Sequence, residues 1–408
     1  MRILILPGTH DCGNLGDVAM LQSALLRLGA RWPEAVFSVL TEAPDQLKMH
    51  CSAVESVPWA GARGWLRMEA LPRLFFPGIR PEIRRRFPCT PARLRWLAGM
   101  LSPARGAAVR RFATALFNAD LVVMSGCGMI ADAFSPAAMR ALATLAAAGR
   151  GGIPTAMLGQ GIGPLEGGEL FQRAAKTLPQ VGAIFVRERL TTPDVLKRCG
   201  VAPEKIFVTG DDTVEMAFNE KRPALGDGIG VNLRLANYSA LGDEMVAAMR
   251  GPLLEQVRRH QSTLIGIPTQ RHETRSDVES LERLVGGQDA GAEQDTPLKI
   301  IRRISGCRVV VTASYHAGVF ALSQGIPIIG LVKSAYYRDK FQGLAGEFGG
   351  GCAVLPADAA DFPAKLSAAI DEAWDQAEAL RPQLLAAADR QIKAGRAAYD
   401  RLPGLLRR

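Results

Sequence analysis

The chain has 408 residues, of which 48% are hydrophobic and 22% are charged, and this length and composition favour two domains with ordinary hydrophobic cores. Because the sequence contains neither a run of about 18 apolar residues nor a signal-peptide pattern, we expect a cytoplasmic protein. The seven cysteines form no CxxC pair, which argues against a disulfide framework and a zinc site. The net charge of +9 permits an anionic ligand, a nucleic acid or an acidic membrane surface as a partner and does not choose among them.

Short runs rich in Ile and Val alternate along the chain with Ala- and Leu-rich amphipathic stretches. In the first half these runs predict buried strands at Arg2–Leu6, Val36–Leu40, Leu121–Met124, Thr155–Leu158 and Ile184–Val186. A second series predicts strands at Gly228–Leu233, Thr263–Ile267, Arg308–Val311, Ile326–Leu331 and Ala353–Leu355. Because strands that alternate with helices form parallel sheets, we predict an α/β fold with two Rossmann-like, doubly wound parallel-sheet domains that face a cleft.

A polar segment with Pro and Gly, Asn219–Asp227, separates the two series of strands and has the composition of an interdomain linker. We therefore expect an N-terminal domain over residues 1–222 and a C-terminal domain over residues 223–370. From about Asp371 the chain is rich in Ala, Leu, Glu and Arg, which predicts a helical segment over residues 371–408.

One segment, residues 61–111, interrupts the alternation of strands and helices. It contains 12 Arg against the acidic residues Glu69 and Glu82, with Trp and Phe between the arginines. This composition suits the headgroup region of an anionic membrane, so the insertion could contact the inner face of a membrane or a lipid-linked acceptor. A solvated basic helical hairpin packed on the first domain explains the pattern equally well. Nucleic-acid binding ranks last, because no recognised binding module accompanies the basic residues.

Glycine-rich turns follow three predicted strands of the first half, at Gly8–Asp17, Ser125–Ile130 and Gly159–Pro164. The first turn leads into a helix and takes the crevice position of an open α/β sheet, where small residues let backbone amides face a ligand. The structural alternative is a tight turn in which Asn14 or Asp17 only caps the helix. The candidate binding positions in these turns are Asn14, Gly16, Asp17, Gly126, Gly128 and Gly161.

Two further strand ends carry residues suited to chemistry on an anion. Arg187 and Arg189 follow the strand that ends at Val186 and suit bidentate binding of phosphate or carboxylate, with surface ion pairing as the alternative for each. His316 lies near the start of a predicted helix, where the helix N-terminus favours a neutral imidazole and an anion. His316 is thus a candidate general acid or base, and a structural histidine is the alternative.

Four weaker candidates also lie near predicted strand ends. Arg271 and His272 follow the strand Thr263–Ile267, and Asp212, beside Asp211 in a glycine turn, could form a carboxylate pair or merely cap the turn. Lys340 follows the strand Ile326–Leu331 and could contact a phosphate, or it could be a solvated lysine of a helix.

Taken in chain order, these motifs resemble the pattern of the polysaccharide pyruvyl transferase family over roughly residues 1–350. The matching pieces are Gly13–Asp17, Ser125–Gly128, Gly159–Pro164, Arg187–Glu188, the Asp211 turn and the stretch from Tyr315 to Pro327. The resemblance implies the two-domain architecture called GT-B. It also implies transfer of a pyruvyl group from phosphoenolpyruvate to two hydroxyls of a sugar, with release of phosphate, in the biosynthesis of exopolysaccharide or cell-surface glycan. The sugar acceptor would be nucleotide-linked, lipid-linked or polymeric.

By the same resemblance, His316 matches the motif histidine and is the expected acid or base, and Arg187 matches an anion-binding arginine. Further donor-binding residues are expected among the turn positions above and at Ser314, Tyr315 and Lys340. The implied transfer has no redox step, so no cofactor is expected, and no metal-ligand spacing is evident.

The chain departs from the resemblance at Ser314, where many family members have Arg in a Ser-x-Arg-Leu-His pattern. Arg189, Arg271 or Lys340 could offset the lost guanidinium. Two other functions therefore stay open: a GT-B glycosyltransferase that uses a nucleotide sugar, and a catalytically silent scaffold of a polysaccharide-assembly complex.

Overall fold

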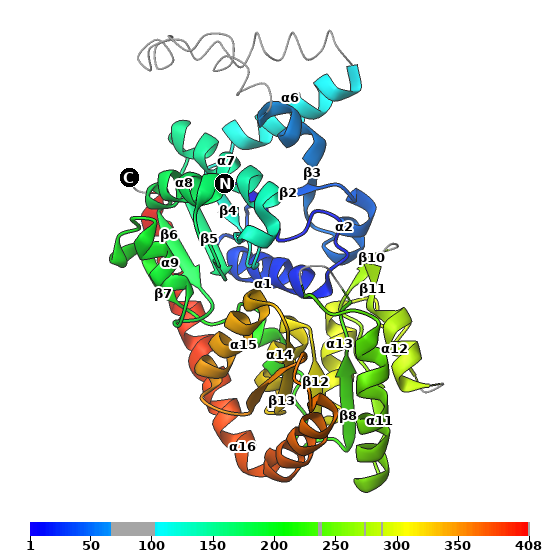
Figure 1. Cartoon of the computed structure of the whole chain (residues 1–408). Coiled ribbons are helices and arrows are strands. Elements are labelled where there is room, and N and C mark those ends of the chain that lie inside the picture. Colours follow the sequence, from blue (N-terminus) through cyan, green and yellow to red (C-terminus); the bar gives the residue numbers. More distant parts are fainter. Residues whose placement is uncertain (67–102, 236–238, 273–274, 287–288, 407–408) are drawn as a thin grey trace.

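The computed structural model describes residues 1–66, 103–235, 239–272, 275–286 and 289–406. Two parallel sheets, each with helices on both faces, form an N-terminal and a C-terminal domain that meet along one interface (Figure 1). The predicted pair of doubly wound α/β domains is thereby confirmed.

The N-terminal sheet has seven strands in the order β3-β2-β1-β4-β5-β6-β7. They are β1 (Arg2–Leu6), β2 (Val36–Thr41), β3 (Glu55–Pro58), β4 (Leu121–Met124), β5 (Thr155–Gln160), β6 (Ala183–Val186) and β7 (Ile206–Val208). In β1 the side chains of Leu4 and Leu6 join one core and those of Ile3 and Ile5 join the core on the opposite face. Burial on both faces explains why the central strands are continuous apolar runs.

The two edge strands of this sheet, β3 and β7, are missing from the sequence prediction. β3 has the sequence Glu-Ser-Val-Pro, of which only Val57 is buried, and β7 has three residues that are partly or largely exposed. An edge strand is covered less completely than a central one, so it needs no apolar run and leaves little signal.

The helices of the N-terminal domain are connected to its strands in alternation along the chain. Those with described bounds are α1 (Leu15–Arg31), α2 (Pro44–His50), α6 (Pro103–Phe117), α7 (Ser135–Arg150), α8 (Gly168–Thr177), α9 (Thr192–Arg198) and α10 (Val214–Asn219).

The C-terminal sheet has five parallel strands in the order β14-β13-β12-β8-β9. They are β8 (Gly228–Asn232), β9 (Leu264–Gly266), β12 (Cys307–Thr312), β13 (Ile328–Val332) and β14 (Cys352–Pro356), and each was predicted with ends that differ by at most two residues. The surrounding helices are α11 (Glu244–Arg259), α12 (Asp277–Val285), α13 (Pro297–Ile304), α14 (Tyr315–Ser323) and α15 (Ala335–Phe348). A separate hairpin pairs β10 (Arg271–His272) with β11 (Arg275–Ser276).

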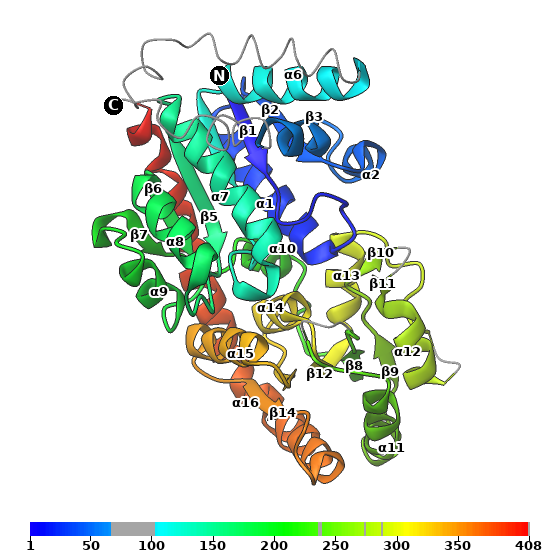
Figure 2. The same cartoon turned by 45° about the horizontal axis from the view of Figure 1, so that its top comes forward.

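A long helix, α16 (Phe362–Tyr399), begins before the predicted start near Asp371 and connects the two domains (Figure 2). Near its start, Leu366 and Ile370 pack in a core of the C-terminal domain, whereas Tyr399 at its end packs in a core of the N-terminal domain. The helix therefore crosses the interface and fixes the two domains to each other. Among the helices of the described residues, none combines the length and hydrophobicity that a membrane span requires.

The end of α16 is attached to the N-terminal domain by a buried polar cluster. Arg27 of α1 donates from Nη1 to Oδ1 of Asp212 at 2.8 Å, and the Tyr399 hydroxyl donates to Oδ2 of Asp212 at 3.0 Å. Glu215 accepts hydrogen bonds from both Arg27 and Arg396. Burial raises the pKa of Asp212 to about 6 although Arg27 opposes this shift. Asp212 thus joins α1 to α16.

Only the two ends of the Arg-rich insertion at residues 61–111 lie within the described residues, at residues 61–66 and 103–111. Both ends pack on the N-terminal domain, where Trp65 and Val109 belong to the same core. The Trp59 ring stacks on His10, with ring centroids 3.6 Å apart. Burial lowers the pKa of His10 to about 4, with Arg140 nearby contributing and a backbone contact at Leu40 opposing. The proposed contact with a membrane falls largely outside the described residues.

We expect Arg27→Ala to lower the free energy of unfolding by about 3–5 kcal/mol at pH 7, because it leaves the buried Asp212 carboxylate without its cation. The loss should be smaller at pH 5, where the carboxyl can stay protonated. Urea unfolding measures both values. The matched control is Arg31→Ala on the same helix, whose partner Asp400 is 69% exposed, and it should change stability by less than about 0.5 kcal/mol. Equal losses in the two variants would contradict this prediction.

A second prediction concerns the pH dependence of stability through His10. Its pKa is lower in the folded chain than in the unfolded chain, so the unfolded chain takes up the proton first. The His10 contribution to stability should therefore be complete above about pH 6.5 and decrease as the pH falls toward 4, by up to about 3 kcal/mol. His10→Phe keeps a ring against Trp59 and should lose this part of the pH dependence in urea unfolding. A native-minus-variant difference that is constant between pH 7 and 4 would disprove it.

Candidate functional site

The site lies where the carboxyl ends of the strands in the two sheets meet. In the N-terminal sheet the strand order reverses between β1 and β4, and in the C-terminal sheet it reverses between β8 and β12. Ligands of open α/β sheets bind at such switch points. Loops from both switch points contact each other here, because the Leu15 N–H donates to the Thr269 carbonyl at 2.9 Å and Asn14 forms a β-bridge with Gln270.

Three buried side chains from different strand ends form the centre of the site. Arg187 follows β6, Asp211 lies in the turn after β7, and His316 lies in the first turn of α14; none is more than 6% exposed. Oδ2 of Asp211 lies 3.7 Å from Nη1 of Arg187 and 3.9 Å from Nε2 of His316. Among the described residues, neither Nη atom of Arg187, nor that Asp211 oxygen, nor His316 Nε2 has a hydrogen-bond partner.

Glycines allow this close approach of the two domains. A Cβ atom at Gly16, at the start of α1, would lie 2.1 Å from Nδ1 of His316. Cβ atoms at Gly128 and Gly161 would lie 2.8 Å from Nη2 and 2.6 Å from Nε of Arg187. Gly126 instead makes room for the Met20 side chain. Asn14 caps α1, accepting hydrogen bonds at its side-chain oxygen from the Gly16 and Asp17 amides.

Aromatic rings and a lysine of the C-terminal domain complete the cluster. The Arg187 guanidinium lies 4.0 Å from the ring centroid of Tyr315, and Lys340 donates a hydrogen bond from Nζ to the Tyr336 hydroxyl. That hydroxyl donates to the carbonyl of Gly128 at 2.8 Å, so α15 is docked on the N-terminal domain. Figure 2 shows α14 and α15 at the boundary between the domains.

The electrostatics of the site favour an anion beside a neutral imidazole. Burial, Arg187 and Lys340 hold the pKa of His316 well below its ordinary value. Burial and Arg187 likewise lower the pKa of Lys340 well below its ordinary value. Burial opposes the charge of Arg187, but Tyr315 and Asp211 raise its pKa overall, so this guanidinium stays charged. Burial raises the pKa of Asp17 to about 6 against the effect of these cations.

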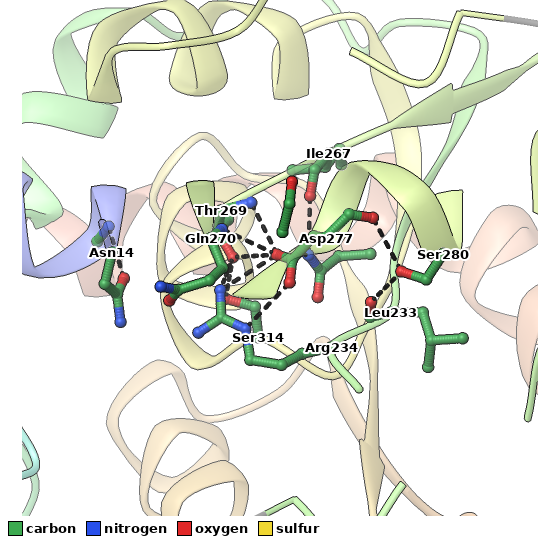
Figure 3. Close-up of polar contacts among 12 residues, drawn as sticks. Asn14, Leu233, Arg234, Ile267, Thr269, Gln270, Asp277, Ser280 and Ser314 are labelled. Carbon is green, nitrogen blue, oxygen red and sulfur yellow. Dashed lines mark hydrogen bonds and ion pairs between the residues drawn. The ribbon is translucent and has the colours of Figure 1, made fainter. Parts of the chain in front are cut away.

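Ser314 belongs to a buried polar network that the sequence did not indicate (Figure 3). Its hydroxyl accepts a hydrogen bond from the Thr269 hydroxyl at 2.9 Å, and Thr269 accepts one from Nη2 of Arg234 at 2.6 Å. Arg234 also forms an ion pair with Asp277 at the start of α12. Arg234 lies two residues after the end of β8 and directly after the predicted strand Gly228–Leu233, so a charged residue at the end of a predicted strand was the available signal.

The structure brings some of the predicted site residues together and places others elsewhere. One centre is surrounded by Arg187, His316, Tyr315, Lys340 and the turn glycines other than Gly126. Asp211 joins them, whereas its neighbour Asp212 faces Arg27 and Tyr399.

Two of the remaining predicted candidates have polar partners away from Arg187, Asp211 and His316. Arg189 is 68% exposed and pairs with Glu347 of α15, and Arg271 donates to the carbonyl of Ala292. His272 lies in strand β10. The roles that the sequence assigns to these residues stay predictions. Among the described residues, no three His, Cys, Asp or Glu side chains gather as metal ligands.

One protein-family model matches most of the chain. The model, described as polysaccharide pyruvyl transferase, matches residues 14–333. The matched stretch includes Asn14, Arg187 and His316, whereas Lys340 lies beyond its end. No curated protein matches the sequence significantly.

Solved structures of similar fold align over nearly the whole chain. The UDP-GlcNAc 2-epimerase of Methanocaldococcus jannaschii has a TM-score of 0.57 at 12% identity and covers 99% of this chain and 100% of its own. The UDP-GlcNAc 2-epimerase of Neisseria meningitidis, bound to UDP-GlcNAc, has a TM-score of 0.55 at 13% identity, with both chains covered completely. The calicheamicin glycosyltransferase CalG4 has a TM-score of 0.52 at 14% identity, covering 100% of this chain and 99% of its own. At these identities the likeness shows the GT-B fold alone.

The contact between Gly16 and His316 gives a prediction about stability. Because a Cβ at position 16 would overlap the imidazole, Gly16→Ala should lower the free energy of unfolding by about 1–3 kcal/mol and change the imidazole NMR signals of His316. The matched control is Gly29→Ala on the same helix, where the nearest atom would lie 4.0 Å from the new Cβ. This control should be neutral or stabilising by up to about 1 kcal/mol. A stable Gly16→Ala variant with unchanged His316 signals would contradict the close contact.

Proposed function

Because the chain belongs to the polysaccharide pyruvyl transferase family, we propose that it transfers a pyruvyl group from phosphoenolpyruvate to two hydroxyls of a sugar and forms a cyclic ketal. The observation that carries this proposal is the buried guanidinium of Arg187, whose terminal nitrogens have no hydrogen-bond partner among the described residues. A buried charged donor that is not saturated is suited to a carboxylate or phosphate, which can accept two parallel hydrogen bonds from it.

The charge of the donor fits the charge of the site. Phosphoenolpyruvate has a carboxylate and a phosphate, and Arg187 and Lys340 approach the centre from different domains. Burial and Arg187 lower the pKa of Lys340, and a bound anion would raise this pKa again and favour the charged ammonium. Anion binding thereby relieves the repulsion between the two basic groups.

The reaction requires a specific movement of protons. A sugar hydroxyl adds to C2 of the enol phosphate, the methylene carbon gains a proton and becomes a methyl group, and the C2–O bond to phosphate breaks. The second hydroxyl then adds to C2 and closes the ketal. One hydroxyl proton ends on the methyl carbon and the other on the released phosphate, so the transfer needs a group that first accepts and then donates a proton.

His316 is the residue assigned to this proton transfer. Its imidazole is neutral because burial and the nearby cations lower its pKa, so it can accept a proton from a hydroxyl. The donor anions offset the charge of those cations and stabilise the imidazolium that results, which can then protonate the methylene carbon. Asp211, whose Oδ2 lies 3.9 Å from Nε2 of His316, is placed to orient the imidazole.

The proposal also includes the sugar acceptor and the place in the cell where the protein acts. The acceptor is a sugar that is nucleotide-linked, lipid-linked or part of a polymer, in the biosynthesis of exopolysaccharide or cell-surface glycan. The protein acts in the cytoplasm, and the Arg-rich insertion at residues 61–111 brings it to the membrane when the acceptor is lipid-linked.

Phosphate release from phosphoenolpyruvate in the presence of a panel of sugar acceptors tests the proposal. His316→Gln should lower kcat by roughly 10²- to 10⁴-fold, because it removes the proton-transferring group. Arg187→Gln should lower kcat/KM by at least roughly 10-fold, because it removes a charged hydrogen-bond donor. His260→Gln and Arg302→Gln serve as controls, since these residues pair with Asp371 and Glu220 outside the site, and both should keep native activity.

Absence of acceptor-dependent phosphate release, together with protection of the native chain from thermal unfolding by a nucleotide sugar, would overturn the donor assignment. The glycosyltransferase function considered from the sequence would then replace it. Native activity in the His316→Gln variant would reject the role of His316 and leave the donor assignment intact.

A further inference from the structure

One face of α15 contacts the ends of two strands of the N-terminal sheet. Tyr336, Lys340, Gly343 and Glu347 follow one another at intervals of four, three and four residues, so they lie on the same side of the helix. Tyr336 contacts the loop after β4, whereas Gly343 and Glu347 contact the loop between β6 and α9, residues 187–191. The helix therefore connects two loops that lie at the candidate site.

The loop between β6 and α9 carries Arg187 and is held by the carboxylate next to it. Glu188 accepts hydrogen bonds from the backbone amides of Leu190, Thr191 and Thr192, at 2.6–2.8 Å. Burial opposes the charge of Glu188, but its hydrogen bonds together lower its pKa, so the carboxylate is charged. Glu188 thus fixes this loop to the first turn of α9.

Glu347 holds the same loop on α15. Its Oε1 accepts hydrogen bonds from the Arg189 amide at 3.1 Å and from Arg189 Nε at 2.8 Å, and its Oε2 accepts one from Nη2 at 3.0 Å. The Glu347 side chain is 2% exposed and that of Arg189 is 68% exposed. A Cβ atom at Gly343 would lie 2.9 Å from Cγ of Glu188, so the helix also packs directly on the loop. These contacts fix the chain two residues beyond Arg187.

The contact between loop and helix brings two basic groups together. Arg187 belongs to the loop and Lys340 to α15, and a Cβ atom at Gly128 would lie 2.8 Å from Arg187 Nη2 and 2.6 Å from Lys340 Nζ. The two nitrogens are therefore close neighbours, and Arg187 adds to the effect of burial in lowering the pKa of Lys340. Repulsion between these groups favours separation of α15 from the loop whenever Lys340 is charged. The three hydrogen bonds to Glu347 oppose this separation.

We propose that Glu347 is a positioning residue of the donor site, which holds the loop between β6 and α9 on α15 and so sets the place of Arg187 relative to Lys340. This proposal rests on the proposed function, in which these two groups bind an anionic donor. Arg189, a candidate donor ligand from the sequence, acts here through Glu347 instead.

The direction of the effect separates positioning from a direct effect of charge. Burial chiefly raises the pKa of Tyr315, whose ring lies on Arg187, and the charge of Glu347 adds to this shift. A carboxylate whose field reaches the site weakens the binding of an anion, so its removal should strengthen binding if only charge acts. If Glu347 positions Arg187, its removal should weaken binding, because the donor must then order the loop as it binds.

Calorimetric titration with phosphoenolpyruvate measures this direction. Glu347→Ala should weaken binding by roughly 10-fold, whereas Glu347→Gln, which keeps an oxygen that accepts from Arg189, should stay within about 3-fold of the native affinity. In steady-state kinetics with a sugar acceptor, Glu347→Ala should raise the KM for phosphoenolpyruvate and keep kcat within about 2-fold. The matched control is Glu378→Ala, which removes the carboxylate paired with Arg308 in the same domain and should bind like the native chain.

A double-mutant cycle tests the role of Arg189. Arg189→Ala removes two of the three hydrogen bonds to Glu347, so it should weaken phosphoenolpyruvate binding in the native chain. The double variant Arg189→Ala with Glu347→Ala should bind no more weakly than Glu347→Ala alone, because both changes break the same contact. A further loss of roughly 10-fold in the double variant would show that Arg189 contacts the donor directly, and would overturn its assignment to Glu347.

Glu347→Ala should stay folded, because Arg189 is largely exposed and keeps its hydration when its partner is removed. Glu347→Asp is a second variant, which keeps the charge but shortens the side chain, and it should also bind phosphoenolpyruvate more weakly. Circular dichroism and thermal unfolding check the folding of both variants.

Two outcomes separate this role from the proposed function. Native or tighter binding of phosphoenolpyruvate in folded Glu347→Ala or Glu347→Asp would overturn the role of Glu347 and leave the proposed function standing. Failure of the native chain itself to bind phosphoenolpyruvate would overturn the donor assignment, and the role of Glu347 in positioning the donor site would fall with it.

Discussion

The burial of the Arg187 guanidinium is the constraint on which the site depends. A charge removed from water is stable only when other groups replace its hydration. Asp211 and the Tyr315 ring do so in part, and glycines at positions 128 and 161 provide the space that the guanidinium fills. The charge is thus stabilised, but its terminal nitrogens are not hydrogen-bonded within the described residues. The site is therefore built for an anion.

The arrangement of the two domains follows from the same constraint. Arg187 and Asp211 come from the N-terminal sheet, whereas Tyr315, His316 and Lys340 come from the C-terminal domain, so neither domain contains the site alone. The domains are fixed to each other by the backbone pairing of the Asn14 loop, by the docking of α15 and by the helix α16. A site assembled across an interface can close around a ligand and exclude water, which strengthens each electrostatic contact inside it.

The surplus of positive charge gives His316 its chemical character. Burial and the nearby cations keep the imidazole neutral, and it gains basicity once an anionic donor offsets those cations. The charge state of the residue that moves protons is thereby linked to the presence of the donor. This link gives a physical reason for a buried histidine to lie among basic groups instead of beside a hydrogen-bonded carboxylate.

The sequence by itself determined the positions of the central strands and the edge of the sheet where the site lies. Buried parallel strands such as β1 and β4 are continuous apolar runs, and the carboxyl ends of parallel strands share one edge, so Arg187 and His316 could be placed in the cleft from the sequence. The edge strands β3 and β7 could not be found, because β3 has a mostly polar sequence and the apolar run of β7 has only three residues.

Only the tertiary structure decided which polar residue faces which partner. Asp211 and Asp212 are neighbours in one turn, yet Asp211 faces Arg187 and His316 while Asp212 faces Arg27, 185 residues away in the sequence. The pairing of Arg234 with Asp277 is decided in the same way. Side-chain direction in a turn and contacts between distant segments depend on how the sheets and helices pack, and a local sequence pattern does not contain that information.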